Sequence, residues 1–209
     1  MLFAQLAEKN QLHFKSGSIN GTSGVAVFNT SCTNRYFLEK RWEQGENILT
    51  AIMMNPSKAS HNETDDTVDQ LISVAETQNC HALFVVNVSS HIQGTSSKTK
   101  VSHFDYEAIN WLFVSNAILE AKMVFLGWGM KGQKGINKQQ KLYPAIVNTF
   151  KTSIDKLYSY EVLKSEDKKF IENPIFYVPH PRPQGQKDKY ANISIQNISS
   201  DEFNCLFVR

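Results

Sequence analysis

Four short apolar runs, separated by longer polar or amphipathic stretches, most constrain what this chain can fold into. They are Ile48–Met54 (ILTAIMM), Ala82–Val88, Lys122–Leu126 and Ile175–Val178. Each is long enough for a strand and too short for a helix, and a nearly continuous apolar run is typical of a strand buried on both faces. Because helical patterns separate the runs, we expect an α/β protein, a three-layer αβα sandwich around a mostly parallel sheet.

The helical patterns lie between these runs. Apolar residues at helical spacing predict long helices over Phe104–Ala121 and Lys138–Leu157. A third helix follows the acidic pair Asp65-Asp66, in which Asp66 is placed to cap the first turn. The same pair could instead hold a metal ion, but no histidine or further carboxylate lies nearby at ligand spacing, so we favour capping.

The flanking segments carry weaker signals. Residues 1–24 are polar and rich in Gly and Ser, which predicts a loosely held arm ahead of a single α/β domain over residues 25–209. Val25–Phe28 is interpreted as an edge strand. Asn34–Trp42 alternates charged with apolar residues and is predicted to form a β-hairpin with the first apolar run. Weaker strands are expected at Tyr160–Leu163 and in the final segment, DEFNCLFVR.

Alternating charges are more typical of a solvated face than of a ligand-binding one. Arg35, Arg41 and Trp42 could face a ligand, but the solvated interpretation is favoured for them.

Composition restricts the class of protein. The chain has 209 residues, of which 41% are hydrophobic and 20% charged, enough to bury one core. A net charge of +2 is too small for an obligate nucleic-acid coat protein. The three cysteines lack metal-ligand spacing, and the sequence shows no secretory leader and no apolar stretch of membrane-spanning length. We therefore expect a cytoplasmic protein without membrane association.

Polar groups follow each apolar run at its carboxyl end. They are Asn55-Pro56-Ser57, Asn87, the turn Gly127-Trp128-Gly129, and His180 between two prolines and followed by Arg182. Parallel strands bring their carboxyl ends to one edge of a sheet, where open α/β sheets bind ligands. We therefore expect these groups to converge on one crevice.

The chemistry of this set favours recognition over acid–base hydrolysis. There is no carboxylate pair among these groups, and the sequence contains no Ser-His-Asp order, no Walker loop and no G-x-G-x-x-G motif. Two amides, an aromatic ring, an imidazole and a guanidinium suit a planar hydrogen-bonding ligand such as a nucleobase. No cofactor or metal is expected.

The order of these motifs resembles a known superfamily. Four motifs are similar, in their order, to the motif set of the uracil-DNA glycosylase superfamily, which has a three-layer αβα fold. They are MMNPS, VVNVSSH, VFLGWGMKGQKG and HPRP. Together with RYFLEKRW and the DDT that follows MMNPS, they resemble more closely an uncharacterised bacterial and phage family, domain of unknown function 1643. That family names no activity, so a mechanism is implied only by the more distant resemblance.

The superfamily resemblance implies roles for particular residues. Asn55 falls at the position that orients the attacking water, Asn87 at the position that reads the edge of the base, and His180 at the position that donates a hydrogen bond to the departing base. The same motifs give the further substrate-binding candidates, namely Pro56, Ser57, Gly127, Trp128, Lys131 and Arg182.

One departure from the superfamily changes the expected substrate. After HPRP the chain reads QGQKDKY, without a leucine to insert into a duplex. Single-stranded or modified nucleic acid, or a free nucleotide, is therefore the expected partner. We expect a DNA glycosylase-like hydrolase acting on the N-glycosidic bond of a damaged or modified base. The alternatives are a non-catalytic module that binds a nucleotide or modified base, and a phage or defence interaction factor.

Overall fold

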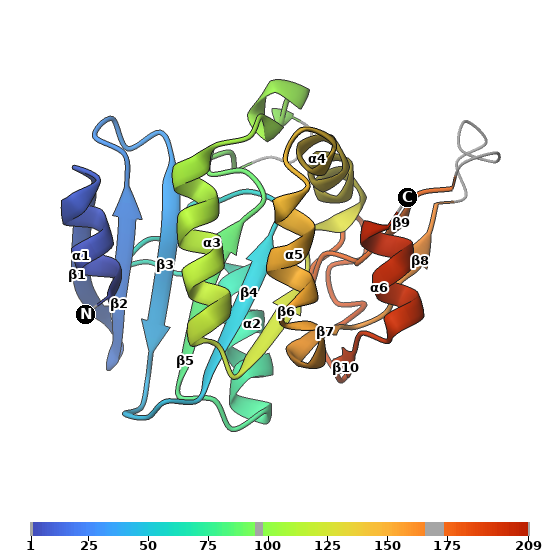
Figure 1. Ribbon diagram of the computed structural model, residues 1–209. Helices are drawn as coiled ribbons and strands as arrows, with labels where there is room; N and C mark the ends of the chain where they lie inside the picture. The colour runs from blue at the N-terminus through green and yellow to red at the C-terminus, as the bar shows by residue number, and fades with distance from the viewer. Residues whose placement is uncertain (1, 95–97, 166–173, 209) are drawn as a thin grey trace.

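The fold is built on one mixed sheet of eight strands. The computed structural model describes residues 2–94, 98–165 and 174–208, and Figure 1 shows its ribbon. The strand order is β1-β2-β3-β5-β4-β6-β7-β10. The strands are β1 (His13–Ile19), β2 (Thr22–Phe28), β3 (Arg35–Arg41), β4 (Ile48–Met53), β5 (Ala82–Asn87), β6 (Met123–Leu126), β7 (Leu157–Ser159) and β10 (Gln196–Asn197).

The centre of the sheet is parallel, as the apolar runs predict. β4 pairs in parallel with β5 on one side and β6 on the other, and β6 pairs in parallel with β7. All six residues of β4 and all six of β5 are buried. Three of the four predicted core strands are thereby confirmed.

The fourth predicted core strand is wrong. Ile175–Val178 contributes only β9 (Phe176–Tyr177), which pairs antiparallel with β8 (Leu163–Lys164) in a separate two-stranded sheet. Pro174 and Pro179 border the run, and proline cannot donate to a ladder, so the strand stays short. β7 occupies the position in the main sheet that was expected for this run.

The N-terminal strands pair differently from the predicted hairpin. β3 lies between β2 and β5 and is antiparallel to both, so it does not form a hairpin with β4. The hairpin that does form joins β1 to β2 through Asn20 and Gly21, whose φ angles are 50° and 81°. Two such residues are typical of a type I′ turn. β2 is therefore an internal strand and not the expected edge.

Residues 2–24 belong to the folded body, so the expected loosely held arm is wrong. α1 (Leu2–Lys9) buries Phe3 and Ala7, and the ring of Phe3 stacks on Phe37 of β3 with centroids 3.8 Å apart. β1 then pairs with β2 along its whole length. The polar composition of this segment reflects the exposed outer face of β1.

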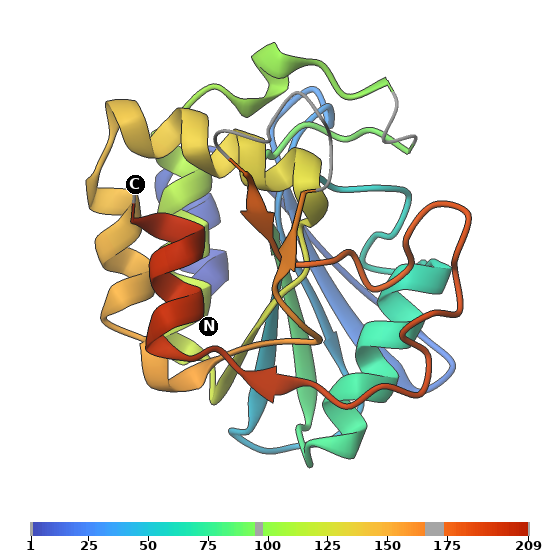
Figure 2. The same cartoon turned by 90° about the vertical axis from the view of Figure 1, so that its right-hand side faces the viewer.

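Helices cover both faces of the sheet, as Figure 2 shows. α3 (Ala108–Glu120), α5 (Ala145–Lys151) and α6 (Ser200–Phe207) pack on one face together with α1. α2 (Asp66–Thr77) packs on the other, and the segment that contains Tyr190 and Ile195 extends the apolar cluster there. This arrangement confirms the α/β class. No helix in the described ranges is both long and apolar enough to cross a bilayer.

The helix boundaries differ from the predicted ones for local reasons. α3 begins four residues later than expected, after the 3₁₀ turn η2 (Val101–Phe104). The expected second helix is two helices, α4 (Gly129–Leu142) and α5, because Pro144 interrupts the pattern. The final segment is α6 and not a strand, since Ser199 and Glu202 form a reciprocal capping box at its start.

We predict that the N-terminal helix contributes strongly to stability. Phe3→Ala should lower the free energy of unfolding by about 3–5 kcal/mol, because it empties a site in contact with Phe37. Urea denaturation measures this, and Glu8→Ala on the exposed side of α1 is the matched control. A loss below about 1 kcal/mol for Phe3→Ala would contradict the packing of α1.

Candidate functional site

The candidate site lies where the winding of the parallel sheet reverses direction. From β4 the chain crosses through α2, on one face, to β5, and from β5 it crosses through α3, on the opposite face, to β6. β4 thus has β5 on one side and β6 on the other. The edge outside the carboxyl ends of β4 and β6 is the position where open α/β sheets bind ligands.

Asn55 joins the loops that follow β4 and β5. Its Nδ2 donates to the main-chain oxygens of Pro56, at 2.9 Å, and Gln93, at 2.8 Å. The main-chain N–H of Gln93 donates in turn to Pro56 O at 2.9 Å. These contacts use both N–H groups of the Asn55 amide, while its oxygen accepts no hydrogen bond from the described residues. The available group is therefore an acceptor.

Asn87 is the last residue of β5 and lies opposite Met53 in the parallel register. Its side chain is 1% exposed, and neither its Oδ1 nor its Nδ2 has a hydrogen-bond partner among the described residues. Strand alternation places it on the α2 face, with Val85 and Leu83. A buried amide without partners costs about 1–3 kcal/mol for each unsatisfied group. Such an amide is a candidate for ligand recognition.

The glycine and tryptophan after β6 have packing roles. Trp128 is fully buried, donates from Nε1 to Gln133 Oε1 at 2.9 Å, and packs against Phe150 and Phe207. Its ring faces the core, so the expectation that it faces a planar ligand is wrong. A Cβ on Gly127 would lie 2.5 Å from Phe125 Cε1, 3.1 Å from the Met53 sulfur and 3.2 Å from Pro181 Cδ. Glycine is needed there for close packing within the chain.

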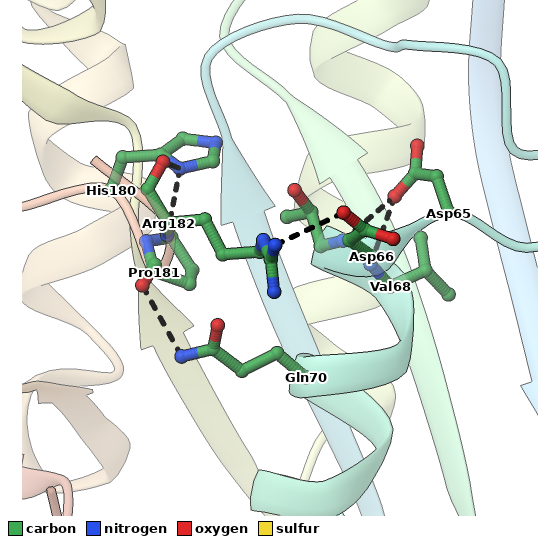
Figure 3. A network of polar contacts seen from close by, with 8 residues as sticks. Asp65, Asp66, Val68, Gln70, His180, Pro181 and Arg182 are labelled. Atoms are coloured by element: carbon green, nitrogen blue, oxygen red, sulfur yellow. Dashed lines mark hydrogen bonds and ion pairs between the residues drawn. The ribbon is translucent and has the colours of Figure 1, made fainter. Parts of the chain in front are cut away.

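The segment His180–Pro183, here called the HPRP strap, crosses this edge and is attached to the start of α2 (Figure 3). Arg182 Nη2 pairs with Asp66 Oδ2 at 3.0 Å, and Gln70 Nε2 donates to Pro181 O at 3.2 Å. A Cβ on Gly129 would lie 3.8 Å from His180 Cβ. His180 thus lies beside the end of β6, although β9, which precedes the strap, is not part of the main sheet.

His180 is half-buried and held by its neighbour. Its Nδ1 lies 3.0 Å from both the main-chain nitrogen and the main-chain oxygen of Arg182. Burial lowers the pKa of the imidazole, and two effects oppose that shift: the hydrogen bond that a protonated Nδ1 donates to Arg182 O, and the charge of Asp65. The ring is therefore neutral near pH 7. In the tautomer that accepts the Arg182 N–H, the proton is on Nε2.

The acidic pair is divided between two structural roles. Asp65 caps α2, with Oδ1 accepting from the N–H groups of Thr67, at 3.1 Å, and Val68, at 3.0 Å, and it also accepts from the Ser57 hydroxyl. Capping therefore falls one residue before the predicted Asp66, which pairs with Arg182 instead. Within the described ranges, no group of three or more His, Cys, Asp or Glu side chains is arranged to hold a metal ion.

Arg35 lies at the candidate site, although its sequence pattern favoured a solvated face. β3 is antiparallel to β5, so its first residue lies at the same edge as the end of β5. Arg35 is 2% exposed and donates from Nη1 to Ala59 O, while its Nε has no partner in the part of the chain that the structure describes. Burial lowers its pKa to about 10, and the charge of Asp65 opposes the shift. Only the strand pairing reveals this position.

Other predicted residues lie elsewhere or support neighbouring segments. Lys131 Nζ donates to Thr99 O at 3.4 Å, next to the loop that follows β5. Arg41 pairs with Glu39 at 2.8 Å, and Trp42 borders a pocket at the amino end of β5. The structure thus brings the loops of Asn55 and Asn87 together beside the HPRP strap, and removes Trp128 from that set.

The unpartnered amide of Asn87 makes a testable prediction about stability. Asn87→Leu should raise the free energy of unfolding by about 1 kcal/mol or more, because it removes buried polar atoms without breaking a hydrogen bond. Asn110→Leu is the matched control and should lower it by about 1–3 kcal/mol, since Asn110 Nδ2 donates to Asn87 O. Urea denaturation distinguishes them, and a destabilised Asn87→Leu would show that the amide is bonded inside the protein.

The lowered pKa of His180 predicts a pH dependence of stability. Below the ordinary pKa of 6.5 the unfolded chain binds a proton that the buried imidazole resists, so the free energy of unfolding falls as the pH decreases from 6.5 towards the folded pKa. His180→Gln should reduce this fall. His61 and His103, whose pKa values are also lowered by burial, should retain their part of it. Denaturation between pH 5 and 7.5 measures the difference, and identical profiles would contradict burial of the neutral ring.

Comparison with known proteins places the chain in a family. A search of curated proteins finds no match. A family model, however, matches residues 35–169, which include β3, β4, Asn55, β5 with Asn87, and the whole of α4, while the HPRP strap lies beyond the match. Because the matched region covers more than half of the 209 residues, the chain belongs to the family described as Protein of unknown function (DUF1643).

Proposed function

We propose that this protein recognises a nucleobase at the carboxyl ends of β4 and β6 and hydrolyses its N-glycosidic bond. The carrying observation is the buried amide of Asn87, which has a donor and an acceptor without partners among the described residues. A neighbouring amide oxygen on Asn55 and a neutral imidazole on His180 lie at the same edge. A likeness to the uracil-DNA glycosylase fold is part of this proposal.

The reaction needs an oriented water. Asn55 Oδ1 accepts a hydrogen bond from a water whose oxygen attacks the sugar carbon C1′. The C1′–N bond breaks with its electron pair passing to the base, through an oxocarbenium-like state. An amide cannot remove a proton, so the attacking water loses its proton to solvent after the bond has loosened. The amide N–H groups, both engaged by main-chain oxygens, keep the oxygen in place.

His180 stabilises the departing base. With Nδ1 accepting the Arg182 N–H, Nε2–H is a neutral donor for the negative charge that develops on the base. Removing one such preorganised donor typically costs about 10²–10³ in rate. The base takes up its proton from solvent after release.

A second candidate is a non-catalytic module that binds a modified base or nucleotide. Two observations favour it. The N–H groups of Asn55 already hold two loops together, which is a structural use of this residue. Trp128 is in the core, so it offers no ring on which a base could stack.

We predict that base release depends on Asn55. Single-stranded 20-mer oligonucleotides, each containing uracil or another altered pyrimidine, should yield abasic products with the wild type, scored by alkaline cleavage. Asn55→Ala and His180→Ala should each lower the rate by about 100-fold or more. Asn192→Ala, at an exposed position, is the matched control.

The outcomes separate the two candidates. No release by the wild type across the panel, or release undiminished by Asn55→Ala, would exclude the hydrolase. A thermal shift with free nucleosides that is lost in Asn87→Leu, without base release, would establish the binding module instead.

A further inference from the structure

We propose that a basic surface formed by α4 and residues 98–104 binds the backbone of single-stranded nucleic acid and delivers it to the candidate site at the carboxyl ends of β4 and β6. The inference rests on the proposed function for the identity of the base bound at that site. The surface itself is argued from charge, spacing and exposed rings.

α4 carries four lysines on one side. Successive lysines are three, four and three residues apart, which aligns them along one face of a helix. They are Lys131, Lys134, Lys138 and Lys141. The buried face is formed by other residues, among them Gly132, Gly135 and Ile136. No acidic residue occurs between Gly129 and Leu142.

A second basic segment lies against this helix. Lys98 and Lys100 are exposed, and residues 88–104 contain no acidic side chain. Two lysines of α4 hold the segment through its main chain: Lys131 Nζ donates to Thr99 O at 3.4 Å, and Lys138 Nζ donates to Val101 O at 3.2 Å. Figure 1 shows α4 and the adjoining turn at the end of the sheet towards which the parallel strands run.

The charge of this surface contrasts with the rest of the chain. The six lysines of α4 and residues 98–104 carry a formal charge of +6. Because the net charge of the whole chain is +2, the remaining residues together carry −4. Among the nearby acids, Asp105 pairs with Lys138, and Glu107 accepts hydrogen bonds from Tyr36 and Ser90. A concentrated positive surface on a chain with little net charge favours a polyanion at this place.

Aromatic rings lie where the lysine row ends. Tyr143, the residue after α4, is 43% exposed, and its ring stacks on Tyr106 with centroids 3.6 Å apart. Tyr106 also lines a cavity of about 230 Å³, together with His91 and His103, whose rings are 4.0 Å apart. Basic side chains beside exposed rings are the combination by which proteins bind single strands, since every base has a face that can stack.

A charge-reversal pair tests the surface. Fluorescence anisotropy with fluorescein-labelled oligo(dT)20 measures the affinity, and Lys134→Glu with Lys141→Glu should weaken it about tenfold. The slope of log affinity against log salt should fall by about 1.4, or about 0.7 for each lost contact. Lys122→Glu with Lys151→Glu is the matched control. It changes the net charge equally, again with one lysine from a final helical turn, and should leave the slope nearly unchanged.

The ring makes an independent test. Tyr143→Ala should weaken oligo(dT)20 binding about fivefold or more, whereas Tyr143→Phe should retain it. Circular dichroism and thermal melting establish that each variant is folded before its affinity is compared.

The results decide the proposal separately from catalysis. No binding of oligo(dT)20 by the wild type, equal losses in both lysine pairs, or preferential binding to vesicles of 70% phosphatidylcholine and 30% phosphatidylserine would overturn it. Binding that depends on Lys134 and Lys141 and persists in Asn55→Ala supports it, even where no base is released. Base release that is unaffected by the lysine pair, without oligo(dT)20 binding, would overturn the surface and leave the hydrolase.

Discussion

The burial of β4 on both faces is the constraint on which the rest of the structure depends. A strand of six buried residues needs helices on both sides of its sheet, and α2 and α3 supply them by crossing on opposite faces. Even its one polar side chain is satisfied internally, since Thr50 Oγ1 donates to Ala117 O at 2.8 Å. The opposite crossings leave the carboxyl end of β4 uncovered by either connecting helix. Asn55 lies there, next to the loop that follows β5.

Local pattern is enough to predict β4, β5 and β6, because each is a nearly continuous apolar run that helices must cover. It fails where pairing or capping decides the outcome. Ile175–Val178 resembles a core strand until its bordering prolines are considered. The final segment resembles an edge strand until Ser199 and Glu202 are read as a capping box. Both signals are present in the sequence, and both outweigh apolar content.

The sequence likewise predicts the position of some residues of the candidate site and not of others. Asn55 and Asn87 could be placed at one edge because parallel strands share the direction of their ends. Arg35 could not, since its position follows from the antiparallel pairing of β3 with β5, a contact between segments far apart in the chain. The sequence GWG indicates a close approach of the backbone but not its partner. The neighbours of Gly127 are the Phe125 ring, the Met53 sulfur and Pro181 of the strap, while Trp128 is buried in the core.

Asn87 differs from the buried glutamines in its hydrogen bonding. Gln133 accepts from Trp128 and donates to Leu206 O at 2.8 Å, and Gln139 donates to Val88 O at 3.1 Å while accepting from Trp111. Among the buried side chains that the structure describes, Asn87 alone has both ends of an amide unpaired. Leaving that amide unbonded costs stability that an apolar residue in β5 would avoid. This cost is the physical reason for our proposal that the Asn87 amide binds a ligand.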